Sequence, residues 1–169
     1  MTESERPDLH PQLAPIAWLV GTWQGAGVGG YPGSGDFQFG QELVIEHDER
    51  PILFHDSRTW LIDSATGEPG RALASERGFW RLPVPDPDGE VELVLAHGSG
   101  VVEIWLGRVT RLSVELATDV VVRTASAKEI TGGHRQYGLV DGDLLWSYDM
   151  AAEGQPLQPH LSARLRRMR

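Results

Sequence analysis

The sequence has no cysteine among its 169 residues. Disulfide frameworks and thiolate metal sites are therefore excluded, and the composition fits a reducing compartment. No apolar run approaches the roughly 18 residues that a membrane span requires, and the first ten residues are acidic and polar, unlike a signal peptide. We therefore expect a cytoplasmic protein without a membrane partner.

Positive charge is scarce as well. The formal net charge is -9 at pH 7, and Lys128 is the only lysine. Nucleic acids attract basic surfaces, so a nucleic-acid partner is not expected.

Helical patterns are nearly absent. Only residues 11–20 show apolar positions at helical spacing, and Pro11 and Pro15 restrict them to a short or partly 3₁₀ helix. The remaining chain consists of short segments rich in Val, Ile, Leu and aromatic residues, at roughly the 8–12-residue spacing of all-β barrels and sandwiches. The expected strands are 41–47, 52–62, 77–82, 90–97, 101–107, 113–122, 128–131, 135–140, 144–150 and 161–167.

Turn and alternation signals support antiparallel strands. The Asp-Gly pairs at Asp88 and Asp141 predict tight hairpins, because this pair tolerates positive φ angles. Strand 144–150 alternates, with Leu144, Trp146, Tyr148 and Met150 on one face. We expect residues 1–10 to form a flexible N-terminus and residues 11–169 a single domain.

A glycine-rich stretch, GTWQGAGVGGYPG, spans Gly21–Gly33 and contains the pattern Gly25-x-Gly27-x-x-Gly30. This pattern matches the dinucleotide-binding fingerprint, which requires a helix after the glycines. The following residues, YPGSGDFQFG, cannot open a long helix, which disfavours nucleotide binding. A short helix followed by Gly21-Thr22-Trp23 is instead typical of lipocalin-like barrels, where the tryptophan seals one end and small residues let the first strand bend.

Three stretches of the chain resemble the nitrobindin family in the same order. They are Gly21–Pro32, which carries Gly21, Trp23, Gly25 and Gly27, then Ala127–Thr131 and Gln155–Leu165. The likeness covers nearly the whole chain, including Glu92–Gly107. The resemblance implies an all-β fold: an antiparallel up-and-down ten-stranded barrel, similar to lipocalins and fatty-acid-binding proteins, with a short N-terminal helix.

The resemblance also implies a function. Nitrobindins bind one haem b per subunit, react with nitric oxide and isomerise peroxynitrite to nitrate at a ferric iron, and a homodimer is suggested by family likeness. By the match, His160 would be the iron ligand and hence the catalytic residue, and Lys128 would contact the haem at a propionate. Met150 would contribute to the apolar wall, and Leu73 and Ala74 would line the opposite face of the haem.

The residues alone leave the ligand open among six histidines. His160 follows Pro156 and Pro159, but it shares strand parity with Ser162 and Arg164 rather than with the apolar positions. An inward ring therefore requires residue 160 to lie in the turn before the strand. His97 shares a face with Val91, Leu93 and Leu95 and is the alternative ligand or a pocket-lining residue. We interpret His47 and His55 as edge or surface residues.

Other functions remain open on the residues alone. The barrel could carry a fatty acid or another apolar ligand, act as a haem-based nitric oxide carrier or sensor, or, least favoured, bind a nucleotide. No Ser/His/Asp or paired-carboxylate arrangement is visible in the spacing of the acidic strand residues.

Overall fold

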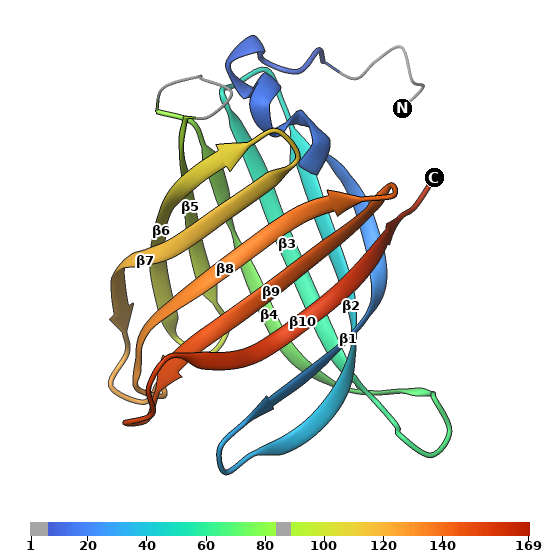
Figure 1. Cartoon of the computed structure of the whole chain (residues 1–169), viewed down its shortest axis with the longest axis vertical. Helices are drawn as coiled ribbons and strands as arrows, with labels where there is room; N and C mark the ends of the chain where they lie inside the picture. The colour runs from blue at the N-terminus through green and yellow to red at the C-terminus, as the bar shows by residue number, and fades with distance from the viewer. Residues whose placement is uncertain (1–6, 84–88) are drawn as a thin grey trace.

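The computed structural model describes residues 7–83 and 89–169, and they form one closed antiparallel barrel (Figure 1). Each strand pairs with its neighbour in sequence, and β1 closes the barrel against β10. The expected all-β up-and-down barrel is thereby confirmed. The strands are β1 (Gly21–Tyr31), β2 (Gly35–His47), β3 (Ile52–Ile62), β4 (Pro69–Arg81), β5 (Glu90–His97), β6 (Val101–Thr110), β7 (Ser113–Arg123), β8 (Ile130–Val140), β9 (Asp143–Ala152) and β10 (Gln158–Arg167).

One end of the barrel is closed by the 3₁₀ helix η2 (Pro11–Leu19), at the top of Figure 1. Its side chains Leu13, Ile16 and Leu19 are fully buried against the barrel. Trp23 lies under the helix, where its Nε1–H donates to the carbonyl oxygen of Leu19 at 2.9 Å. The Arg167 guanidinium covers the Trp23 ring at 4.1 Å from the ring centre. Tryptophan and helix therefore seal this end, as the sequence predicts.

The glycines of β1 permit a close approach to β10. A Cβ at Gly25 would overlap the carbonyl oxygen of Arg164, and one at Gly27 would overlap that of Ser162. The chain continues after these glycines as a strand and a hairpin into β2, with no helix. The glycines therefore serve barrel closure, and the dinucleotide fingerprint is a chance match.

The hairpin predicted at Asp141 is confirmed, because Asp141 and Gly142 have φ angles of 52° and 82°. The turn predicted at Asp88 lies partly outside the described residues. Two strands expected at 128–131 and 135–140 are one strand, β8, because its glycines do not interrupt the pairing with β9. The first half of β4 was not expected as a strand, because glycine, proline and alanine replace the usual strand residues there. β1 was expected only from the lipocalin-like start at Gly21-Thr22-Trp23, and its composition alone did not indicate a strand.

The N-terminal residues are described from Pro7 onward. The flexible segment predicted for residues 1–10 therefore lies mostly outside the described residues. Leu9 packs against the core, and His10 caps η2 by accepting the Gln12 amide at 3.2 Å.

Candidate functional site

The end of the barrel opposite η2 is the open end, at the bottom of Figure 1. Inward-facing residues near η2 are fully buried, whereas Phe37, Leu73, Ile130 and Leu161 near the open end are only partly buried. A pocket at this end is lined by residues that include Tyr31, Phe37, His160 and Leu161. β5 ends there, β10 begins there, and the β7–β8 connection passes there, so the strand order brings the sequence-predicted site residues to this end.

His160 lies in this pocket between two tyrosines. Its ring centre lies 5.5 Å from that of Tyr31 and 5.6 Å from that of Tyr148, and both contacts are edge-on. Its Nδ1–H donates to the carbonyl oxygen of Gly30 at 3.0 Å. This bond places the proton on Nδ1, so Nε2 keeps its lone pair. A backbone carbonyl on one ring nitrogen is the usual support for a histidine that ligates metal through the other.

A β-bulge turns the His160 side chain inward. β10 begins at Gln158, so His160 lies within the strand and not in the preceding turn. The register with β9 shifts between Pro159 and Leu161, which leaves His160 as the extra residue. The bulge resets the alternation, so His160 and the apolar residues from Leu161 onward both face the interior. The parity argument fails because of this one irregularity.

The surroundings keep the imidazole neutral. Burial lowers the pKa of His160 below its ordinary value of 6.5, and the positive charges of Arg135 and Lys128 add to this lowering. The hydrogen bond to Gly30 opposes it. A neutral ring with a free Nε2 is the form that binds iron.

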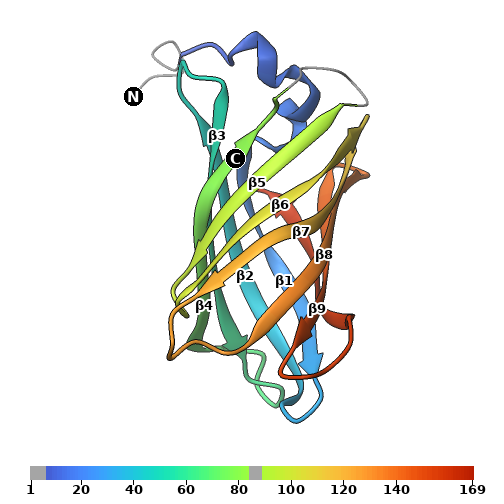
Figure 2. The same cartoon turned by 90° about the vertical axis from the view of Figure 1, so that its left-hand side faces the viewer.

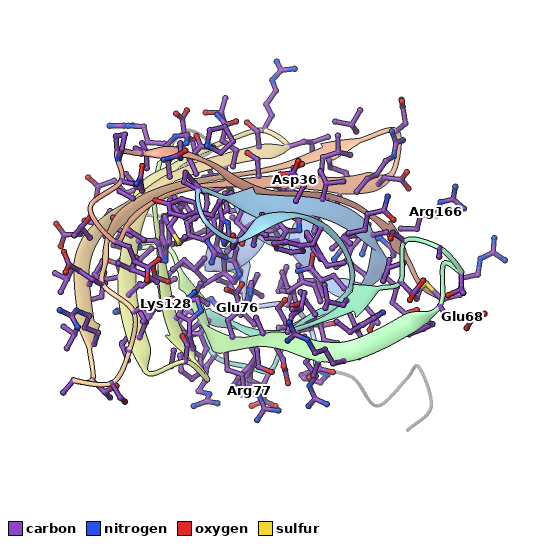
Figure 3. The ribbon with its side chains drawn as sticks, turned by 90° about the horizontal axis from the view of Figure 1, so that it is seen from below. Asp36, Glu68, Glu76, Arg77, Lys128 and Arg166 are labelled. Atoms are coloured by element: carbon purple, nitrogen blue, oxygen red, sulfur yellow. The ribbon has the colours of Figure 1, made fainter. Side chains whose placement is uncertain are left out.

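The other residues predicted to contact the haem are Met150, Lys128, Leu73 and Ala74. Met150 is nearly buried on the inner face of β9, and Lys128 lies exposed at the open end, as the view from that end shows (Figure 3). Leu73 is partly buried against the core, and Ala74 is exposed. The register between β3 and β4 shifts between Thr59 and Trp60, next to these two residues. Their place beside the haem stays a prediction.

His97 is engaged on both ring nitrogens. Nε2 is hydrogen-bonded to Glu103 Oε1, and Nδ1 lies 3.6 Å from Glu76 Oε2. With a carboxylate beside each ring nitrogen, His97 is less well placed than His160 to bind a metal. The alternative that His97 lines the pocket stays a prediction.

A buried polar network lies inside the barrel and reaches His160 through Tyr148. Arg135 donates from Nη1 and Nη2 to the two carboxylate oxygens of Glu76, at 2.9 and 2.8 Å. The guanidinium lies 4.6 Å from the centre of the Tyr148 ring, so Tyr148 contacts both Arg135 and His160. Burial favours the neutral form of Glu76, but the charge of Arg135 and the hydrogen bond from His55 hold its pKa well below the usual value.

His55 belongs to this network, so its interpretation as an edge or surface residue is wrong. It is 2% exposed, accepts the indole N–H of Trp80 at 3.1 Å and donates through Nε2 to Glu76 at 3.0 Å. The flanking charges suggested an outer position, but the ring lies on the inner face of β3. Sequence reasoning also missed Tyr31, Glu76 and Arg135; the signal for Arg135 was its shared parity with Tyr137.

The pocket fits a haem rather than a bare metal ion. Within residues 7–83 and 89–169, no three His, Asp or Glu side chains form a metal-binding cluster. An ion held by His160 would therefore take its other ligands from a cofactor. A neutral imidazole, a partly buried apolar rim and a cation at the mouth are what haem b requires.

The fold and site define a class of protein: a β-barrel sealed at one end, with a partly buried histidine in a pocket at the other. Residues 12–167 match the family model for the THAP4-like, heme-binding beta-barrel domain, and the chain belongs to this family.

Individual relatives agree with this assignment. The chain is 56% identical over 162 residues to a peroxynitrite isomerase of Nocardioides sp. (strain ATCC BAA-499 / JS614), covering 95% of this chain and 96% of that protein. It is 45% identical to a ferric nitrobindin-like protein of Kineococcus radiotolerans, covering 96% and 97%. The crystal structure of Rv2717c from M. tuberculosis is similar, with a TM-score of 0.83 and 40% identity over 96% of this chain and 100% of that chain. None of the helices in the described part of the chain could span a membrane.

Proposed function

We propose that this protein holds one ferric haem b through His160 and isomerises peroxynitrite to nitrate. The observation that carries the proposal is the His160 geometry: Nδ1 donates to Gly30, and Nε2 is free in an apolar pocket. Relatives covering nearly the whole chain are named peroxynitrite isomerase, which supports the same activity here.

A bound ferric haem would supply a Lewis acid for the isomerisation of peroxynitrite. His160 would hold the iron through Nε2, and Gly30, Tyr31 and Tyr148 fix the plane of its ring. Leu73, Leu161 and the other rim residues exclude water from the reacting molecule, and Lys128 is placed to bind a propionate.

The first test is a titration of the apoprotein with ferric haem, followed by absorbance. The wild type should give a saturable one-to-one Soret spectrum, and His160→Ala should lose or shift it. His134→Ala is the matched control, because His134 contacts Glu115 on the outside of the barrel. An unchanged spectrum in His160→Ala would move the ligand elsewhere.

The second test is the decay of peroxynitrite followed by stopped-flow absorbance. Holoprotein should accelerate the decay relative to apoprotein, with nitrate as the product. Normal haem binding without acceleration would contradict the catalytic proposal and favour a nitric oxide carrier or sensor.

Three further points belong to the proposal. We propose that nitric oxide binds at the same open iron position, because it needs only an accessible iron in an apolar pocket. A cytoplasmic location is supported by the absence of cysteine, which suits a reducing compartment. We also propose a homodimer, as family likeness suggests.

A further inference from the structure

The outer face of β4–β7 is apolar, which is unusual for the outside of a barrel in water. Phe79, Val94, Ile104 and Val120 lie directly opposite one another on the four adjacent strands and form one continuous row. Ala96, Val102 and Val122 form a second row beside it. Figure 2 views the barrel from the side of these strands. We call these two rows, together with Leu106, the apolar face.

The apolar face is not part of the core. The residues that alternate with it, such as Glu103 and Trp105 on β6, already point inward and are buried. Six of its side chains are between 36% and 59% exposed: Phe79, Val102, Ile104, Leu106, Val120 and Val122. The outer face of β10 is different, because it carries Ser162, Arg164 and Arg166. The outer face of β10 therefore lacks the two apolar rows that β4–β7 carry.

The exposed area matches what one partner contributes to a stable interface. Such residues expose about 150 to 200 Å² each when fully accessible, so these fractions leave roughly 450 Å² of apolar surface. A standard interface buries about 800 Å² per partner, of which about 57%, or about 450 Å², is apolar. The apolar face therefore supplies the area that a specific contact needs.

The border of the apolar face suits self-association. Arg77 pairs with Asp56 at 3.0 Å along one border, and Arg81 pairs with Glu92 at 3.4 Å along another. Each border thus carries both signs of charge. When two copies meet across a two-fold axis, the same surface faces itself, so each arginine can approach an acidic residue of the other copy. The net charge of -9 disfavours an anionic lipid surface as the occupant.

We propose that the apolar face of β4–β7 is the surface through which two copies of this chain associate. The inference gives the homodimer a location and does not depend on haem chemistry. Because each copy carries a charge of -9, the two copies repel at long range. Added salt should therefore strengthen the association.

The test is sedimentation equilibrium of the full chain between about 1 and 100 μM, at low and high salt. Wild type should reach twice the monomer mass of 18.6 kDa. Ile104→Glu should raise the dissociation constant at least about 30-fold, as loss of a central contact does. Val28→Glu is the matched control, because Val28 is 57% exposed on β1, outside the apolar face, and should leave the dimer intact.

A second variant keeps the test decisive if Ile104→Glu folds poorly. The chain has no native cysteine, so Ile104→Cys should give a covalent dimer on mild oxidation, and Val28→Cys should not. A wild type that stays monomeric at all concentrations would overturn the proposal. So would a dimer that survives Ile104→Glu, or cross-linking that is equal at both positions. Haem titration of each variant shows whether the haem site is intact, so a failure of the dimer proposal can be told apart from a failure of the haem proposal.

Discussion

The buried pair of Arg135 and Glu76 gives a sharp prediction about stability. Arg135 is 2% exposed, and both of its terminal nitrogens bond to Glu76. Arg135→Met keeps most of the side-chain volume but leaves the Glu76 carboxylate buried, with His55 as its close donor. Removing one partner of a buried ion pair costs about 3–5 kcal/mol. For a chain of 169 residues, that loss corresponds to a melting temperature lower by roughly 10 °C.

Urea denaturation of the apoprotein at pH 7 measures this loss, with Arg166→Met as the control, because Arg166 points outward from the barrel (Figure 3). Adding Glu76→Gln to Arg135→Met should recover most of the stability, because the buried charge is gone and an acceptor for His55 remains. The reasoning is refuted if the single variant loses less than about 1 kcal/mol, or if the double variant is no more stable than the single one.

The same pair predicts a dependence on pH. The pKa of Glu76 is held well below its ordinary value of 4.5. The contribution of the ionised Glu76 to folding stability is therefore fully present above pH 4.5 and is lost as the pH falls through the folded-state pKa. In Arg135→Met the carboxylate lacks its cation and gains protons at higher pH. The stability difference between wild type and variant should therefore narrow as the pH is lowered from 7 toward 4.

Two further predictions concern the pocket and the barrel closure. The pKa of His160 lies below 6.5. Haem affinity measured by titration should therefore stay level from pH 8 to about 6.5 and fall at lower pH, because protonation removes the Nε2 lone pair. A fall in affinity that begins at pH 7 or above would contradict the neutral imidazole. Gly27→Ala should destabilise the fold by at least about 2 kcal/mol in urea, because the new Cβ would overlap the Ser162 carbonyl oxygen and meet the Phe39 ring at 2.6 Å. Gly33→Ala, with a φ of 89° and no atom within 4 Å of the new Cβ, should lose only about 1 kcal/mol; equal losses would refute the close-approach argument.

The fold could be predicted from the sequence because the strands alternate regularly. The alternation that places Leu144, Trp146, Tyr148 and Met150 inward is present in the structure. β1 was predictable only from the lipocalin-like start at Gly21-Thr22-Trp23, because its glycines are required by contact with β10, and such a contact is invisible in a local pattern. Strand propensity is a prior that tertiary packing overrides.

The sequence indicated which residues lie at the site, but it did not reveal the bulge or the buried polar network that hold them in place. The role of His160 as iron ligand stays a prediction, and it came from resemblance, because parity argued against it until the bulge was seen. The network of Glu76, His55 and Arg135 joins the neighbouring strands β3 and β4 to β8, which is distant in the sequence. Charged residues on strands look like surface residues unless the partner across the interior is known.

β7 and β8 are paired over only part of their length, and this affects local opening of the barrel. These strands pair only from Ser113 to Ala117 on β7, so the segment from Asp119 to Arg123 bonds to β6 but has left β8 (Figure 1). The amides of that segment should exchange with solvent faster than those of β1 or β9, which are bonded on both sides. The wall beside Lys128 should therefore open locally more readily than the end sealed by η2, and hydrogen exchange would show this as weaker protection there.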